Sequence, residues 1–139
     1  MLDLSDPRQA GIAARLSREE FAYFTTVRPD GRPHTVPVCF LWDGVTILIF
    51  SEPNNVKCRN LRRNPYVSLA LDSYGRDNTP VVVEGAAALV DDPEISFLMP
   101  AYVAKYSALA QRIGVTLEQL AQIYTQAILI TPTRIRQDQ

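Results

Sequence analysis

The sequence of 139 residues has few of the side chains from which metal sites and disulfides are built. It contains one histidine, His34, and two cysteines, Cys39 and Cys58, which lack the CxxC spacing of many zinc sites. Because structural zinc usually takes four Cys or His ligands, we expect no metal centre. We expect both cysteines to be reduced, and to be buried as small apolar side chains.

Long apolar runs and a strong excess of either charge are absent as well. The longest apolar runs, such as Val45–Phe50 and Ala127–Ile130, are far shorter than the roughly 20 residues that cross a bilayer. The first residues, Met1–Pro7, have acidic side chains and no signal-peptide core, so we expect a cytoplasmic protein with no membrane partner. The net charge of −1 gives no electrostatic reason to expect nucleic acid as a partner.

Familiar catalytic motifs are also missing. The sequence has no G-x-S-x-G, no G-x-G-x-x-G and no Walker loop, so serine hydrolases, Rossmann proteins and P-loop enzymes lose their main sequence support. The catalytic residues are therefore unknown, and an enzyme of this length would take its chemistry from a bound cofactor. The length suits one domain that spans residues 1–139.

What the sequence does contain is a series of short β-type segments separated by turn signals. Arg28–Gly31 and Asp43–Gly44 have the residues that favour hairpin turns. We expect a bend or bulge near Gly85. The segments with strand character are Phe21–Val27, Pro33–Trp42, Val45–Phe50, Tyr66–Asp72, Pro80–Val90 and a last strand, Ala127–Thr131 and Thr133–Ile135, interrupted by Pro132.

Helical patterns lie beside these strands. Asp6–Pro7 predicts the start of a helix over about residues 7–16, and Ser17–Glu20 then fits either a brief turn or more helix. A short helix over roughly residues 56–63 should end before Asn64–Pro65, because the residue before proline is pushed away from helical geometry.

The C-terminal third predicts a pair of helices within residues 94–124, broken at Ile113–Val115, with Thr116 and Gln119 spaced as a capping box. Residues 73–79 predict a polar loop. Short antiparallel strands at this density favour a small closed or partly closed β-barrel, because closure removes exposed strand edges. A parallel sheet is disfavoured, since it needs a helical crossover between nearly every pair of strands.

A cluster of positive charge is the first functional signal. Four of the fourteen basic residues, Lys57, Arg59, Arg62 and Arg63, fall within seven positions. Lys57 lies near the predicted start of a helix, where free backbone amides attract anions, so it could bind a phosphate group. The alternative is a solvated basic surface, which is the more common role of a charge cluster.

Several segments resemble a known family. Thr26–Val38 (TVRPDGRPHTVPV), Lys57–Pro65 (KCRNLRRNP) and Val83–Ala86 (VEGA) resemble the pyridoxamine 5′-phosphate oxidase-like superfamily of FMN- or F420-binding split β-barrels. The similarity runs in order over nearly the whole chain. The C-terminal segments Pro100–Tyr106, Ile113–Thr116 and Ile130–Arg136 resemble the branch of F420-dependent oxidoreductases in that superfamily.

The resemblance implies a six-stranded antiparallel split β-barrel that forms a homodimer, with a cofactor in each of two grooves at the interface. It places Lys57 at the cofactor phosphate and Ser51 at the adjoining strand end. Relatives can carry another basic residue just before the lysine, where this chain has Asn55–Val56. The resemblance therefore leaves the second phosphate contact to the partner subunit or to Arg59, Asn60 or Arg62.

The resemblance also implies that the strand residues His34, Thr35, Val36 and Pro37 run beside the cofactor ring. Their backbone groups can bond the polar edge of that ring. His34 could also act as an acid or base, although a single histidine beside a hairpin is more often structural.

Two aromatic pairs have alternative roles. Tyr102, Lys105 and Tyr106 are spaced to share one face of a helix, where they either border the groove or, for the tyrosines, pack at a dimer interface. Phe40 and Trp42 alternate along a strand and are expected in the core or at an interface.

The function that the resemblance implies is hydride transfer between F420 and a small organic substrate of unknown identity. A basic patch suits the phosphate and the acidic tail of F420, but the residues alone do not separate F420 from FMN. The alternatives are an FMN-binding oxidoreductase of the same fold and a non-catalytic carrier of a flavin or a haem-like ligand.

Overall fold

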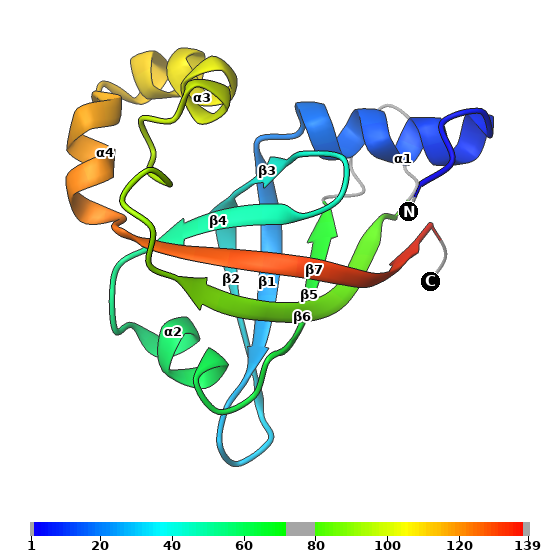
Figure 1. Ribbon diagram of the computed structural model, residues 1–139, viewed down its shortest axis with the longest axis horizontal. Coiled ribbons are helices and arrows are strands. Elements are labelled where there is room, and N and C mark those ends of the chain that lie inside the picture. The colour runs from blue at the N-terminus through cyan, green and yellow to red at the C-terminus, as the bar shows by residue number, and fades with distance from the viewer. Residues whose placement is uncertain (1, 72–79, 138–139) are drawn as a thin grey trace.

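The strands form one curled antiparallel sheet, which wraps partly around its own core (Figure 1). The computed structural model describes residues 2–71 and 80–137, so the predicted loop 73–79 lies outside the described residues. The described strands are β1 (Phe21–Val27), β2 (Pro33–Cys39), β3 (Leu41–Trp42), β4 (Ile47–Ser51), β5 (Tyr66–Leu71), β6 (Val82–Val90) and β7 (Gln126–Arg136). Their order is β2-β1-β5-β6-β7-β4-β3, with every neighbouring pair antiparallel. The split-barrel fold class is confirmed, with seven strands in this part of the chain where six were expected.

The additional strand arises because the chain leaves the sheet pattern at Phe40, in the middle of the strand predicted over Pro33–Trp42. The Phe40 side chain is completely buried in the barrel core. Its amide donates to the Tyr106 hydroxyl at 2.8 Å, and its carbonyl accepts from Lys105 Nζ at 2.8 Å. Side chains of a distant helix therefore satisfy the backbone groups of Phe40, and β2 and β3 are separate strands.

The two longest strands, β6 and β7, pair along most of their length. β7 is one unbroken strand, so the predicted interruption at Pro132 was wrong. Pro132 lies opposite Gly85, where a register shift between Glu84 and Gly85 confirms the expected bulge. The missing side chain of Gly85 makes room for the partner strand, since a Cβ there would lie 2.4 Å from the Thr131 carbonyl oxygen.

The described helices are α1 (Pro7–Arg18), α2 (Val56–Leu61), α3 (Pro100–Ile113) and α4 (Leu117–Ile123). Asp6 caps α1 by accepting a hydrogen bond from the Arg8 amide, and α1 extends two residues beyond the predicted end. Thr116 and Gln119 form the predicted capping box of α4. None of these helices is long and apolar enough to span a membrane.

The helix predicted from Glu94 begins only at Pro100, and turns and bends occupy the residues between them. The reason is local, because Met99 has the extended backbone that a following proline favours (ψ 143°). In Figure 1, α3 and α4 (yellow and orange) lie together at one end of β4 and β7, apart from α1.

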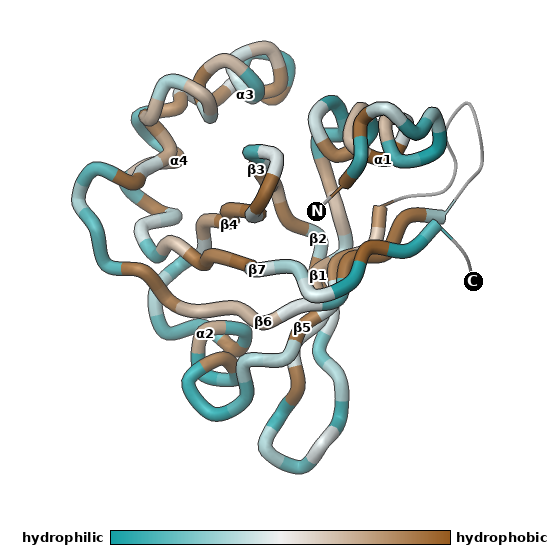
Figure 2. Tube along the Cα trace, turned by 45° about the vertical axis from the view of Figure 1, so that its right-hand side comes forward, coloured by the Kyte–Doolittle hydropathy of each residue, from teal (hydrophilic) through white to brown (hydrophobic). Residues whose placement is uncertain are grey.

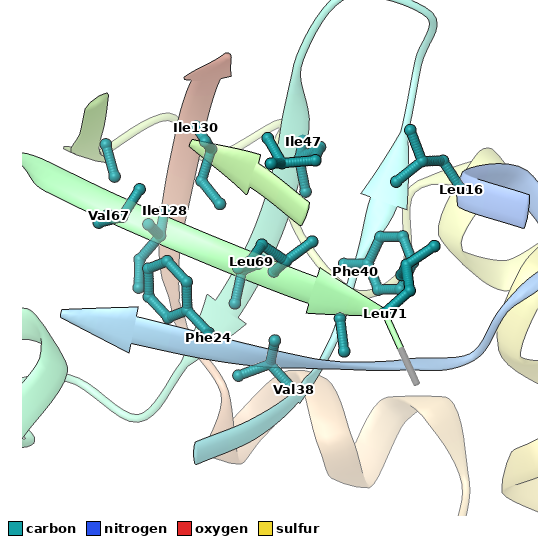
Figure 3. Packing of buried hydrophobic residues seen from close by; sticks show 14 of the residues in the cluster. Leu16, Phe24, Val38, Phe40, Ile47, Val67, Leu69, Leu71, Ile128 and Ile130 are labelled. Carbon is teal, nitrogen blue, oxygen red and sulfur yellow. The ribbon is translucent and has the colours of Figure 1, made fainter. Parts of the chain in front are cut away.

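The inside of the curled sheet contains the larger of two apolar clusters (Figure 3). Phe24, Leu69, Ile128 and Ile130 meet there from three different strands, and Leu16 adds a contribution from α1. Figure 2 shows apolar stretches along several strands, such as β4, and a mixture of hydrophilic and apolar residues in α2. Burial of this apolar surface is the main favourable contribution to the stability of the sheet.

A second apolar cluster lies between α3 and the sheet. Phe50, Phe97 and Tyr102 are its centre, with ring centroids 4.6–5.3 Å apart. Such aromatic contacts hold their partners in defined orientations. The second cluster therefore fixes α3 against β4. Helix α2 follows the end of this same strand.

Candidate binding site

Helix α2 follows closely after β4 and carries Lys57 in its first turn. Asn55 caps the helix by accepting from the Cys58 amide at 3.3 Å, and the buried Cys58 and Leu61 fix its inner face. Lys57 is half-buried, and this burial lowers its pKa, while Cys58 and Glu52 act in the opposite direction. No other residue in the described part of the chain forms a salt bridge with Lys57. The junction therefore presents a partly desolvated cation that Glu52 attracts but that no described carboxylate pairs with at salt-bridge distance.

Ser51, at the end of β4, lies inside this junction. Its hydroxyl is buried and donates to the Glu52 carbonyl at 2.8 Å, and Cys58 Sγ lies 3.6 Å from Ser51 Oγ. In this arrangement Ser51 stabilises the connection between β4 and α2. Ser51 lies at the strand end next to the helix that carries Lys57, as the resemblance implied. Its hydroxyl proton is used in the hydrogen bond to the Glu52 carbonyl.

Asn60 points into the protein. Its side chain is 3% exposed, and Nδ2 donates to the buried Thr26 hydroxyl at 2.9 Å. This hydrogen bond joins α2 to β1. Asn60 therefore fixes the position of the helix that carries Lys57, and its side chain lies in the interior.

Arg59 and Arg62 lie on the exposed side of α2 and both contact Asn54 in the loop before the helix. Arg59 Nη1 donates to the Asn54 carbonyl at 2.8 Å, and Arg62 Nη2 donates to Asn54 Oδ1 at 2.8 Å. Asn54 has a positive φ of 63°, a conformation that is uncommon for residues other than glycine. The two arginines thus stabilise a strained loop, and a ligand would have to compete with Asn54 for them.

Strand β2 contains the other predicted site residues and lies at the edge of the sheet. Thr35 and Pro37 are exposed on its outer face, while His34 and Val36 are partly buried on the inner face. Thr35 shares a hydrogen bond with the Thr25 hydroxyl at 2.8 Å. An edge strand leaves one row of backbone groups without a strand partner, which a planar ligand with a polar edge can use.

The charge of Lys57 influences His34 although the two residues lie on different elements. Burial lowers the pKa of His34, and the positive charges of Arg28 and Lys57 lower it further. His34 Nδ1 is buried and makes no hydrogen bond within the described residues. Near neutral pH the His34 imidazole is therefore neutral, and the charge of Lys57 contributes to this state.

A cavity of about 300 Å³ connects Lys57 with β2 and the C-terminal helices. On the side of the sheet and α2 it is lined by Phe21, Pro37, Val38, Cys39, Phe50 and Lys57. Facing them is a surface that we call the helix wall, which consists of Phe97, Tyr106, Leu109, Ala110, Ile113, Leu120 and Tyr124. Lys57 is the charged member of this lining.

The helix wall was not found from the sequence, because its residues face the sheet only through tertiary packing. The one partial signal was the spacing of Tyr102, Lys105 and Tyr106. Tyr106 does line the cavity, whereas Tyr102 lies behind it with a buried hydroxyl that has no partner. Both tyrosines are almost fully buried within a single chain. They are thus unavailable for packing at a dimer interface, the alternative that the sequence left open.

Lys105 and Cys39 lie next to Tyr106, and both have shifted pKa values. Lys105 Nζ lies 3.9 Å from the centroid of the Phe40 ring, and burial lowers its pKa to about 8. Burial raises the pKa of the Cys39 thiol to about 11, although Lys105 opposes this shift. The thiol that lines the cavity is therefore protonated and neutral near neutral pH.

Two larger hollows among the described residues contain none of the predicted site residues. One of them, of about 470 Å³, lies between α1, the turn after Trp42 and the C-terminal half of β7. In the described residues, no group of His, Cys, Asp and Glu side chains is arranged to hold a metal ion. The smaller cavity beside Lys57 is therefore the better candidate for a functional site, because two predicted site residues, Pro37 and Lys57, line it.

A curled antiparallel sheet, with a short basic helix at one end and a helical pair before the last strand, defines a split-barrel protein. Within that class the chain belongs to the pyridoxamine 5′-phosphate oxidase family, whose profile matches residues 9–138. Among proteins with curated descriptions, no sequence matches this chain.

Solved structures of related fold include proteins with different ligands. An F420 reductase has a TM-score of 0.69 and 25% identity, with 90% of this chain and 95% of that chain covered. An FAD-binding protein from Mesorhizobium loti has a TM-score of 0.65 and 20% identity, with 91% and 88% covered. A haem storage protein from Vibrio cholerae has a TM-score of 0.63 and 16% identity, with 91% and 92% covered. The last two similarities establish the shared fold alone.

Proposed function

We propose that this protein is an F420-dependent oxidoreductase, which transfers a hydride between the deazaflavin and a small organic substrate. The observation that carries the proposal is the position of Lys57, a half-buried cation that forms no salt bridge with the described residues and lines a cavity together with Pro37 of β2. Membership of the family and the similarity to an F420 reductase support the choice of cofactor.

The residues present fit a phosphorylated cofactor with a planar ring. Lys57 would bind the phosphate, since a lysine ammonium acts as a point charge toward phosphate oxygens. The outer edge of β2, up to Pro37, would contact the polar groups of the ring, and His34, whose side chain faces inward, would contribute backbone groups only. Asn60 and Ser51 would act from the interior, by fixing α2 and its junction with β4.

When bound, the deazaflavin supplies the hydride carrier that the chain itself lacks. The residues of the chain position the cofactor and restrict access of water. Phe50 and Phe97 form an apolar surface facing β2. Cys39 keeps its proton, because its pKa is raised to about 11, so the cavity presents no thiolate that could attack an electrophilic substrate.

We also propose that two copies associate through the outer face of the sheet. Tyr23 and Tyr66 project from this face and are 49% and 70% exposed, which is unusual for large aromatic side chains. A second copy that covers them would bring further groups to the edge of β2. Light scattering should show a dimer for the wild type and for Leu4→Glu, and a monomer for Tyr66→Glu; a wild-type monomer would contradict the association.

Parallel titration of F420 and FMN into the wild type, Lys57→Ala and Arg63→Ala tests the cofactor proposal. Loss of one charged contact with phosphate typically weakens binding by about 10–100-fold, so Lys57→Ala should bind F420 less tightly by that amount. Arg63→Ala removes a nearby exposed cation and should change the affinity by less than about threefold. No saturable F420 binding to the wild type would eliminate the proposal, and an unchanged affinity in Lys57→Ala would eliminate Lys57 as the phosphate contact.

The same titrations separate the alternatives. An FMN oxidoreductase would be purified as a yellow protein and would bind FMN more tightly than F420. A carrier would bind its flavin or haem tightly and would transfer no hydride to any compound in a broad panel of acceptors. We favour F420 because the relative at 25% identity is an F420 reductase, whereas the similarity to the haem storage protein is 16%.

A further inference from the structure

The helix wall has a chemical character that differs from the Lys57 end of the cavity. Leu109, Ile113 and Leu120 project from α3 and α4 toward the space opposite β2, with Phe97 and Tyr124 beside them. Ile113 and Tyr124 are 58% and 37% exposed at the ends of their helices. Apolar side chains therefore extend from the interior of the cavity to the surface of the chain.

The helix wall contains no charged side chain, and its polar groups are the hydroxyls of Tyr106 and the partly exposed Tyr124. The Tyr106 hydroxyl donates to the Glu20 carbonyl at 2.7 Å and accepts from the Phe40 amide at 2.8 Å. Across the cavity, the Cys39 thiol is protonated and Lys57 is the single charge of the lining. If Lys57 binds the cofactor phosphate, no cation is left for a second anion.

The wall is also fixed before any ligand binds. Tyr106 and Lys105 attach α3 to the backbone of Phe40, and the rings of Phe50, Phe97 and Tyr102 pack against one another. A preformed apolar surface favours ligands that replace water with ring or hydrocarbon contacts. A charged ligand group placed there would lose its hydration without gaining a partner, which is strongly unfavourable.

We infer that the helix wall binds the substrate of the oxidoreductase, and that this substrate is an uncharged, lipophilic ring compound without a phosphate or carboxylate group. The inference rests on the proposed function, which assigns the Lys57 end of the same cavity to the cofactor. It predicts that one part of the cavity, at Lys57, binds the anionic cofactor, and that the other part, at the helix wall, binds a neutral substrate.

Two fluorescent probes with the same rings test this inference. N-phenyl-1-naphthylamine is neutral, and 8-anilino-1-naphthalenesulfonate carries one negative charge on the same skeleton. Each is titrated into the protein with saturating cofactor, which occupies Lys57. The neutral probe should bind at least about tenfold more tightly than the sulfonate.

Two isoleucine variants locate the binding surface. Ile113→Glu places a charge at the helix wall and should weaken binding of the neutral probe at least tenfold. Ile123 is 47% exposed at the end of α4 and does not line the cavity, so Ile123→Glu should change the affinity by less than twofold. Both positions are exposed enough to accept glutamate, and circular dichroism confirms that each variant is folded.

The outcomes separate this inference from the proposed function. Ile113→Glu should leave the affinity for F420 unchanged, because Ile113 ends α3 whereas Lys57 lies on α2, which Figure 1 shows apart from α3. Equal binding of the two probes, equal effects of the two variants, or competition between the neutral probe and the cofactor would each overturn the inference that the helix wall binds a neutral substrate. Failure of F420 itself to bind would overturn the proposed function. The probe titration without cofactor would then still show whether the helix wall binds the neutral probe.

Discussion

The Tyr106 hydroxyl lies 2.8 Å from the amide nitrogen of Phe40, at the point where β2 ends and β3 begins. The same hydroxyl donates to the Glu20 carbonyl, just before β1. One side chain of α3 thus satisfies backbone groups at two separate places in the sheet. This contact holds the helix wall opposite β2.

Tyr106→Phe should destabilise the protein by about 2 kcal/mol, because it leaves the buried Phe40 amide without a partner. Tyr102→Phe is the matched control. The Tyr102 hydroxyl is buried without a hydrogen bond, so its removal should leave the free energy of unfolding unchanged or slightly increased. Urea unfolding of both variants gives the comparison, and equal effects would contradict the assigned hydrogen bond.

Local sequence patterns were sufficient for much of the fold. The turn at Arg28–Gly31 forms as predicted, with Gly31 at a φ of 87° and the Arg28 amide bonded to the Arg32 carbonyl. The Asp6 cap and the Thr116 capping box are also present. Each of these features depends on residues within a few positions of one another, so the sequence contains the necessary information.

Features that depend on distant residues could not be predicted in this way. Phe40 leaves the strand pattern because Tyr106 and Lys105 bind its backbone. Pro132 is tolerated within β7 at the register shift, where Gly85 pairs with Pro132, Glu84 pairs with Arg134 and Thr133 between them has no register partner in β6. In each case the deciding partner is far away in the sequence.

The candidate site shows the same limit. Local chemistry identified Lys57 as a cation near the start of a helix, and the family resemblance indicated β2. Neither showed that Asn60 points inward to Thr26, or that Arg59 and Arg62 contact Asn54. The helix wall likewise depends on how α3 packs on the sheet, which no motif in the sequence specifies.

Gly85→Ala should destabilise the protein by at least about 2 kcal/mol, because overpacking of a backbone contact cannot be relieved by a side-chain rotation. The added Cβ would lie 2.4 Å from the Thr131 carbonyl oxygen and 3.0 Å from Pro132 Cα. Gly11→Ala offers the opposite case, since Gly11 lies in α1 with no atom within 4 Å of a new Cβ. It should stabilise the helix by about 0.5–1 kcal/mol. Thermal unfolding of both variants tests the pair, and a neutral Gly85→Ala would refute the close approach of β6 and β7.

Alkylation of Cys39 should be slow at neutral pH and should accelerate as the pH rises toward 11. Its raised pKa of about 11, two units above the ordinary value of 9.0, lowers the thiolate fraction at pH 7 roughly a hundredfold. Mass spectrometry after iodoacetamide treatment at several pH values measures the rate. Cys58 is completely buried, so Cys39→Ser should remove the reaction in the folded protein. Rapid modification of Cys39 at pH 7 would be incompatible with a buried, neutral thiol.

The pKa of His34 reports directly on the charge of Lys57. His34 is the single histidine of the chain, so one imidazole resonance can be followed by NMR without ambiguity. Its pKa should lie below 6.5, mainly because of burial and further because of the charges of Arg28 and Lys57. Lys57→Met should raise this pKa, whereas Arg63→Met, which removes a cation of the same cluster, should leave it unchanged.

Binding of a phosphorylated cofactor should move the His34 pKa in the same direction as Lys57→Met, because the phosphate offsets the positive charge of Lys57. A group whose pKa rises on binding takes up protons in the complex, so the affinity for the cofactor should increase as the pH falls toward the pKa of free His34. In Lys57→Met this pH dependence should be smaller, since the cation that draws the phosphate toward His34 is gone. A His34 resonance that titrates identically with and without bound cofactor would show that the phosphate lies elsewhere.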